Sequence, residues 1–302
     1  MLNFKLVELS DKRWVDEISA MEDSPSADYN FANIYMWDKN YFQRLARFQD
    51  FLVILLEYRE EPFFAFPIGR GDLRLLISHL REHNALYGYR ETTFCGVTPE
   101  HLDRLNALFP GEFTATPDTR YWDYVYSAEK LDTLTGKKLH GKRNHINRFL
   151  AENSDWSFRP MTAADAPECY RLLDDWTATC NDEEKLSASD ERSAIDRAFE
   201  HFDYLGLEGG LLYVKDRLVA FTIGEKISSD TYDIHFEKAY ADINGAFPMI
   251  NQQFVRWLRS AHPEIQWINR EDDMGFESLR RSKLSYYPDR MIEKYSVVFK
   301  ND

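Results

Sequence analysis

Polar residues are concentrated in the segment Ile268–Gly275 of this 302-residue sequence, where a predicted strand ends just before a predicted helix. Open α/β sheets bind ligands at such positions, beyond the carboxyl ends of their strands. A carboxylate or phosphate could be bound here by Arg270, Arg280 and Lys283. A substrate ammonium group could be held by Asp272 or Glu271. Ion pairing of these charges among themselves is the alternative interpretation.

A second candidate group lies on the predicted strand Thr231–Glu237. His235 and Glu237 are two positions apart, and successive side chains of a strand alternate between its faces, so the two are expected to share one face. Together with Asp233, this face could supply a general base. We therefore predict His235, Glu237 and Asp272 as catalytic residues. An ion-pair ladder on a half-exposed strand is the alternative.

The segment Gly136–Arg148 is basic and contains no acidic residue. At helical spacing its cations and its apolar residues fall on different sides. The predicted anion-binding residues are Lys138, Lys142 and Arg143, and the predicted apolar stripe is Leu139, Ile146 and Leu150. The spacing predicts a docked helix that displays positive charge to a phosphorylated ligand. A solvated linker is the alternative, although a cation cluster repels itself unless something uses it.

The two halves of the chain open alike, each with a predicted strand followed by a capped amphipathic helix. The matched segments are Phe4–Leu9 with Trp14–Met21, and Trp156–Met161 with Glu168–Trp176. A repeat of this length predicts two copies of one domain rather than a solenoid. We expect an α+β fold with mixed sheets, with one domain at residues 1–153, including the basic segment, and the other at residues 154–302.

Composition and charge exclude several classes of protein. With 44% hydrophobic residues the chain is not disordered, and a net charge of −14 excludes a broad footprint for nucleic acid. Three scattered cysteines without a CxxC motif predict free thiols in a reducing cytoplasm and no metal site. The longest apolar run, Phe51–Leu56, is too short to cross a bilayer, so any contact with the inner membrane face is expected to be peripheral.

Four blocks of this sequence resemble those of an uncharacterised bacterial family similar to the phosphatidylglycerol lysyltransferase C-terminal domain. The blocks are Tyr121–Tyr126, Lys137–Phe149, His235–Ala239 and Ile268–Pro288. The resemblance implies two tandem acyl-CoA N-acyltransferase domains of the Gcn5-related type, joined by the basic helix and related to the Fem-type aminoacyltransferases. It also implies acyl transfer, with aminoacyl-tRNA as the first choice of donor and an amine or hydroxyl as acceptor.

The sequence departs from the acetyltransferases at their coenzyme A loop. That loop has the pattern Q/R-x-x-G-x-G/A and holds a pyrophosphate at a helix N-terminus. Here Asp242 stands in place of the Gln or Arg, and Phe247 in place of the small residue. We therefore expect no required cofactor and disfavour coenzyme A. The alternatives are a coenzyme A-dependent N-acyltransferase and a non-catalytic ligand-binding protein of the same fold.

Overall fold

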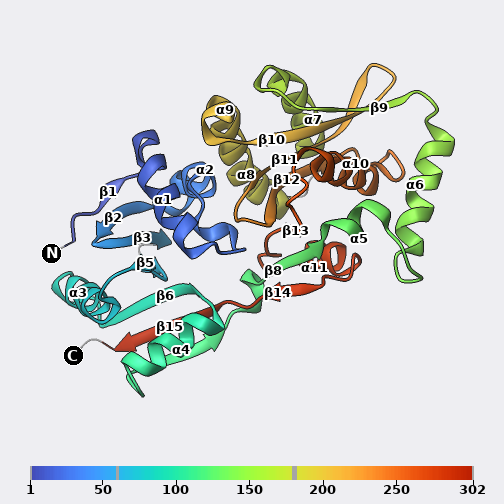
Figure 1. Ribbon diagram of the computed structural model, residues 1–302. Helices are drawn as coiled ribbons and strands as arrows, with labels where there is room; N and C mark the ends of the chain where they lie inside the picture. Colours follow the sequence, from blue (N-terminus) through green and yellow to red (C-terminus); the bar gives the residue numbers. More distant parts are fainter. Residues whose placement is uncertain (1, 59–60, 179–181, 301–302) are drawn as a thin grey trace. The chain divides into compact units, whose positions relative to one another are not determined.

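The computed structural model describes residues 2–58, 61–178 and 182–300. The chain forms two compact units. The first comprises Met1–Asp123, Asp272–Phe276 and Met291–Asp302, and the second comprises Tyr124–Glu271 and Glu277–Arg290. Each unit contains one mixed sheet with helices packed on it (Figure 1).

The sheet of the first unit has the order β1-β2-β3-β4-β6-β15-β7, and β5 pairs with β3 beside this path. Its strands are β1 (Lys5–Leu6), β2 (Arg44–Phe48), β3 (Asp50–Tyr58), β4 (Glu61–Ala65), β5 (Ile68–Arg70), β6 (Glu91–Val97), β7 (Phe113–Pro117) and β15 (Tyr295–Lys300). Its helices are α1 (Lys12–Glu22), α2 (Phe31–Tyr41), α3 (Leu73–Leu86) and α4 (Pro99–Leu108). Strands β4 and β6 pair in parallel, and the other neighbours pair antiparallel.

The sheet of the second unit has the order β14-β8-β13-β12-β11-β10-β9. Its strands are β8 (Asp123–Ser127), β9 (Trp156–Pro160), β10 (Glu208–Val214), β11 (Arg217–Lys226), β12 (Thr231–Ala239), β13 (Trp267–Asn269) and β14 (Arg290–Ile292). Its helices are α5 (Ala128–Thr133), α6 (His140–Glu152), α7 (Ala166–Ala178), α8 (Asp182–Glu200), α9 (Phe202–Leu205), α10 (Ala246–Ala261) and α11 (Glu277–Leu284). Here β12 and β13 form the parallel pair.

Each sheet includes one strand from the other half of the chain. Strand β15, near the C-terminus, lies between β6 and β7, whereas β8 of the first half lies between β13 and β14. From β1 to β15 and from β9 to β8 the two sheets follow the same sequence of antiparallel and parallel neighbours. The compact units therefore differ from a division after residue 153, because ladder hydrogen bonds assign β8 and β15 to the opposite sheets.

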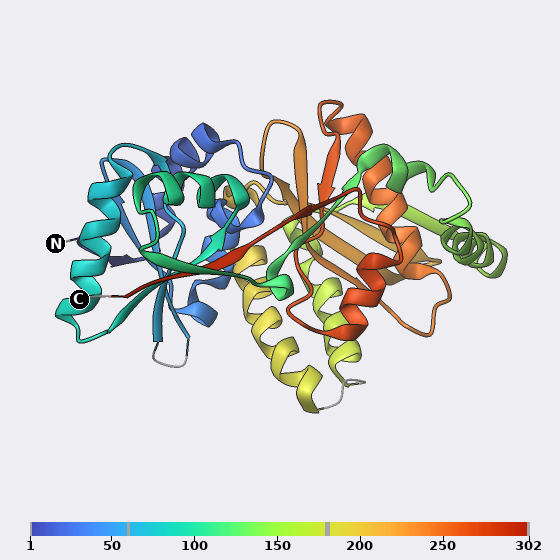
Figure 2. The same cartoon turned by 90° about the horizontal axis from the view of Figure 1, so that it is seen from below.

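Helices cover both faces of the second sheet (Figure 2). On one face, the ring of Phe254 in α10 packs edge-on against Tyr232 of β12, with 5.9 Å between the ring centroids. On the other face, Lys238 of β12 pairs with Glu191 of α8 at 2.6 Å and lies over the ring of Trp176 in α7. A side chain that contacts α10 therefore lies on the first face of this sheet, and a side chain that contacts α7 or α8 lies on the second face.

Two sequence expectations concern cysteines and membranes. Cys95 and Cys169 carry free thiols, and Cys180 lies outside the described residues. None of the helices in the described part of the chain combines the length and the hydrophobicity that crossing a bilayer requires.

Candidate active site

The candidate site lies where the parallel strands β12 and β13 part. Their pairing ends at Asp233 opposite Asn269, while β12 continues to Ala239. Beyond β13 the chain is held by β8, because the Tyr124 amide donates to the Glu271 carbonyl at 3.1 Å and the Arg270 amide donates to the Tyr124 carbonyl at 3.0 Å. A strand from the first half of the sequence thus fixes the polar residues that follow β13.

A β-bulge at His235 separates the polar side chains of β12 into two groups. Ile223 faces Phe236 and Gly224 faces Ile234, which leaves His235 as an extra residue. A bulge breaks the alternation of a strand. The expectation that Asp233, His235 and Glu237 share one face is therefore wrong.

The first group is a buried histidine surrounded by carboxylates. The fully buried His235 side chain has Nδ1 at 2.9 Å from Glu271 Oε1 and 3.0 Å from Asp233 Oδ2, and Nε2 at 3.2 Å from Glu225 Oε1. Burial alone would lower the pKa of His235, but these carboxylates, Asp233 foremost, raise it well above the usual value. His235 is therefore an imidazolium near neutral pH, which cannot serve as a general base.

The same three groups also have the spacing of a metal site. Ligand atoms of Asp233, His235 and Glu271 lie within 4.8 Å of one another. An imidazole that carries both protons has no lone pair to give to a metal ion. The arrangement is therefore an ion-pair cluster as it stands, and the expectation that no metal is bound remains a prediction.

The second group, on the α10 face, centres on an ion pair between Arg270 and Glu237. Arg270 Nη2 donates to Glu237 Oε1 at 2.9 Å, and Asn251 Nδ2 of α10 donates to Glu237 Oε2 at 2.9 Å. The Arg270 guanidinium lies 5.0 Å from the centroid of the Tyr286 ring and 5.9 Å from that of Tyr126. Both charged side chains are almost completely buried, so this pair forms in a protein environment of low dielectric constant.

Lys283 supports this group from α11. Its Nζ donates to the backbone carbonyl of Arg270, and its own carbonyl accepts a bond from the Tyr126 hydroxyl at 2.8 Å. Lys283 is buried, so it positions Arg270 and does not extend toward a ligand. Arg280, also on α11, is partly exposed. Asp272 belongs to the first unit, where its Oδ1 accepts a bond from the Met274 amide at 2.9 Å.

The three cations predicted to bind an anion together lie in three different environments. Lys138 precedes α6 and is exposed, with its Nζ 5.2 Å from the centroid of the Tyr287 ring. Arg143 donates from Nη1 to the carbonyls of Leu134 and Gly136 and so fixes the preceding loop. Lys142 points inward, with its Nζ 3.9 Å from the centroid of the Tyr286 ring. Of the basic segment, only Lys142 belongs to the second group.

The buried side of α6 also differs from its predicted stripe. Leu139 and Ile146 are buried as expected, but Leu150 is 39% exposed and Phe149 is fully buried. The prediction for Leu150 is wrong because the buried face of α6 runs through Ile146 and Phe149, which leaves Leu150 at its exposed edge. Its buried face packs against α10 of the same unit.

Helix α6 covers the N-terminus of α10. Gly245, the N-cap of α10, has φ +79°, and a Cβ atom there would lie 2.2 Å from the carbonyl oxygen of His145. The helix end that would face a pyrophosphate in the acetyltransferase pattern is thus packed against the backbone of another helix. The glycine is required both by its backbone conformation and by this close approach.

Three residues of the second group were not predicted from the sequence. Asn251 is a polar residue in the otherwise apolar buried stripe of α10, which is a signal for a buried hydrogen bond. Tyr126 and Tyr286 are buried tyrosines, whose hydroxyls require partners. The proximity of Tyr126 to Arg270 depends on the exchange of β8, which no local pattern indicates.

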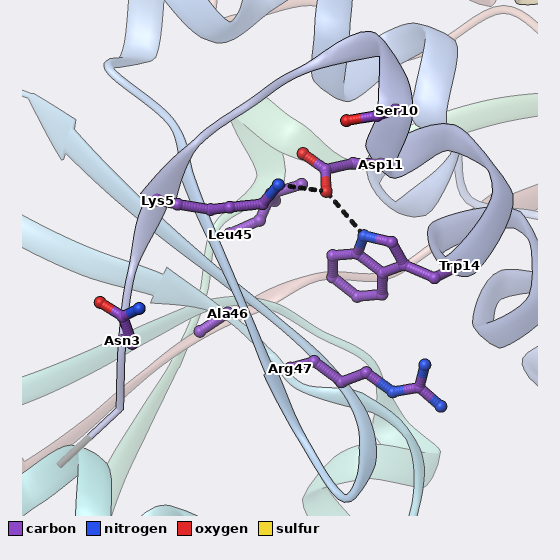
Figure 3. A pocket seen from close by; sticks show the side chains of 8 residues that line it. All are labelled: Asn3, Lys5, Ser10, Asp11, Trp14, Leu45, Ala46 and Arg47. Atoms are coloured by element: carbon purple, nitrogen blue, oxygen red, sulfur yellow. Dashed lines mark hydrogen bonds and ion pairs between the residues drawn. The ribbon is translucent and has the colours of Figure 1, made fainter.

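A separate open pocket of about 420 Å³ lies in the first unit (Figure 3). It is lined by Asn3, Lys5, Ser10, Asp11, Trp14, Leu45, Ala46 and Arg47. Its polar groups bond mainly to each other: Asp11 Oδ1 lies 2.7 Å from Lys5 Nζ and accepts a bond from Trp14 Nε1 at 2.7 Å. Because these groups are already paired, we do not assign the reaction to this pocket.

The chain matches a known family over most of its length. Residues 21–298 match the sequence model described as phosphatidylglycerol lysyltransferase, C-terminal. A conserved protein of unknown function from Bacteroides thetaiotaomicron is 35% identical, and its crystal structure has a TM-score of 0.93 over 99% of this chain and 100% of that chain.

Less similar structures share the fold. The C-terminal domain of a putative lysylphosphatidylglycerol synthetase from Agrobacterium fabrum is 15% identical, with a TM-score of 0.66 over 96% of this chain and 91% of that one. FemX is 9% identical, with a TM-score of 0.61 over 97% and 96% of the two chains. A tandem GNAT protein of clavulanic acid biosynthesis is 11% identical, with a TM-score of 0.52 over 100% and 99%. The expected tandem acyltransferase-like fold is confirmed.

The packing of α6 on α10 can be tested with two glycine substitutions. Gly245→Ala should lower the free energy of unfolding by more than about 1 kcal/mol, because the new methyl group meets the His145 carbonyl and the backbone has positive φ. The matched change Gly141→Ala, which points a methyl group into open space within α6, should be neutral or stabilise by up to about 1 kcal/mol. Urea denaturation measures both. Equal effects would contradict the close packing.

The protonation of His235 can be measured directly by NMR. Because its folded-state pKa is raised, the imidazole should keep both protons at about pH 7.5, and its ¹⁵N shifts should remain those of an imidazolium. The resulting stabilisation is full below the unfolded-state pKa, near pH 6.5, and is lost as the pH rises through the folded-state pKa. The His235 signals are assigned by their absence from the spectrum of the His235→Gln variant. A neutral ring reported by these signals at about pH 7 would contradict this charge state.

Proposed function

The chain belongs to the family of phosphatidylglycerol lysyltransferase C-terminal domains, and from this premise we propose that it transfers an aminoacyl group from aminoacyl-tRNA to an amine or hydroxyl acceptor. In this reaction the acceptor nitrogen or oxygen attacks the carbonyl carbon of the aminoacyl ester. The ester bond to the terminal ribose then breaks, and the proton of the acceptor ends on the ribose oxygen. Such a reaction requires alignment of the two substrates and hydrogen-bond donors for the developing oxyanion.

The groups around the end of β13 support this chemistry. Arg270 is a permanently charged donor, held by Glu237 on its side chain and by β8 and Lys283 on its backbone. Among the predicted catalytic residues, Glu237 is the carboxylate on the same face as Arg270 and is our candidate for accepting the acceptor's proton. His235 carries a proton of its own and is instead assigned to balancing the buried carboxylates.

The observation that carries the choice of donor is the packing of α6 on the start of α10. The α6 backbone at His145 lies against Gly245, the N-cap of α10, so it narrows the space beside the helix end at which a coenzyme A pyrophosphate would bind in the acetyltransferase manner. Phe247 in the first turn of α10 and Asp242 before it add a bulky and a negatively charged side chain. These features favour an acyl donor other than a coenzyme A thioester.

Exposed cations beside α6 support a limited contact with a phosphate backbone. Lys137 and Lys138 are exposed at the start of the basic segment, whereas Arg148 pairs with Glu152 at 2.7 Å. With a net charge of −14 for the chain, only a local contact with tRNA is expected. A lipid acceptor would be reached by a peripheral encounter with the membrane surface.

The proposal can be tested by presenting the protein with both donor classes. Aminoacylated total tRNA carrying radiolabelled amino acids should bind, and label should appear on an acceptor from a lipid or small-molecule extract. Acetyl-CoA titrated by calorimetry should show no site tighter than about 100 μM, or about −5.5 kcal/mol. Replacing Lys137 and Lys138 by Gln should weaken tRNA binding and reduce the salt slope by about two.

A charge-matched control is the pair Arg13→Gln and Lys39→Gln on exposed helix positions of the first unit. This control should leave tRNA affinity and its salt slope unchanged. Low-micromolar saturable binding of acetyl-CoA would instead support a coenzyme A-dependent N-acyltransferase. Transfer from neither donor would contradict the proposed enzyme and favour a ligand-binding protein of the same fold.

A further inference from the structure

Lys142 is a half-buried cation without a carboxylate in contact. Its Nζ lies over the Tyr286 ring, and no hydrogen-bond or ion-pair partner of this atom is found among the described residues. Burial first, and then the positive charge of Arg270, lower its pKa to about 8. A lysine placed this way loses hydration without gaining a partner anion, which is unfavourable for its charged form.

Arg270 has one guanidinium nitrogen without a partner. Nη2 is bonded to Glu237, but the buried Nη1 has no hydrogen-bond partner among the described residues. The side chain of Arg270 is only 10% exposed. A buried guanidinium donor that stays unpaired is unfavourable, so a bound group that accepts its hydrogen bonds would be stabilised.

The charges of this group do not balance. Lys142 and Arg270 supply two positive charges beside the Tyr286 ring, and Lys283 adds a third at the Arg270 carbonyl, whereas Glu237 supplies one negative charge that is already bound by Arg270 and Asn251. A singly charged anion would reduce the excess and could accept hydrogen bonds from both Lys142 and Arg270 at once. Among the described residues, no further side chain pairs with Lys142 Nζ or with Arg270 Nη1.

We propose that Lys142 and Arg270 form a subsite for a monoanionic oxyanion, a carboxylate or a phosphodiester, beneath α6 and beside the ring of Tyr286. The anion accepts from Nη1 of Arg270 and from Nζ of Lys142, while Glu237 and Lys283 keep Arg270 in place. The subsite deepens the proposed function, because it identifies where an anionic group of a substrate would be held. Its test reads binding and is independent of whether acyl transfer occurs.

The subsite can be tested by the reactivity of Lys142 in the native protein. Competitive acetylation at about pH 8, read by mass spectrometry, reports the fraction of each lysine that is uncharged. Acetate and dimethyl phosphate are titrated separately, with sodium chloride keeping the ionic strength constant. A bound anion keeps Lys142 protonated, so its labelling should fall at least about threefold along a saturable curve.

Lys39 is the internal control, because it is exposed on α2 of the first unit and should label equally in all salts. The acetate arm identifies a carboxylate ligand and the dimethyl phosphate arm a phosphodiester. A folded Arg270→Gln variant should show no protection of Lys142 by either anion. The titrations of the unmodified protein test the subsite even when this variant does not fold. Equal labelling of Lys142 at every concentration of both anions would overturn the subsite, whatever the transfer assays give.

Discussion

The pairing of β8 with β13 is the constraint on which the candidate site depends. Strand β13 has three residues, too few to fix the polar residues that follow it. Strand β8 holds the residues after β13 through two backbone hydrogen bonds at Tyr124, and the hydroxyl of its Tyr126 donates to the carbonyl of Lys283. Because β8 comes from the first half of the chain, the second sheet requires both halves, and β15 has the corresponding position in the first sheet.

The docking of α6 has two consequences for the same unit. It covers the N-terminus of α10, where an acetyltransferase binds its pyrophosphate, and it brings Lys142 beneath the helix to Tyr286. The bulge at His235 then separates the charges, so that a protonated histidine with its carboxylates lies on one face and the Arg270 group on the other. Two separately paired groups of charges are thereby kept on opposite faces within a few residues of β12.

Much of the local structure could be predicted from the sequence, because periodicity and caps are local. The hairpin of β10 and β11, helix α10 and the polar block after β13 all follow from such patterns. The exchange of β8 and β15 could not, because it depends on pairing between distant segments. The inward direction of Lys142 and Lys283 depends on packing of the same kind. Gly224 in the middle of a strand was a signal for the bulge at His235, since an internal glycine often marks one.

Native-state hydrogen exchange of the Tyr124 and Arg270 amides tests most directly whether β8 fixes the site. Both amides belong to the pairing of β8 with the chain after β13. If the pairing orders the site, the two amides exchange as slowly as the Ile268 amide inside β13, through unfolding of the unit. Exchange as fast as that of the exposed Gly136 amide would contradict the account, because Arg270 would then lie on a segment that β8 does not hold.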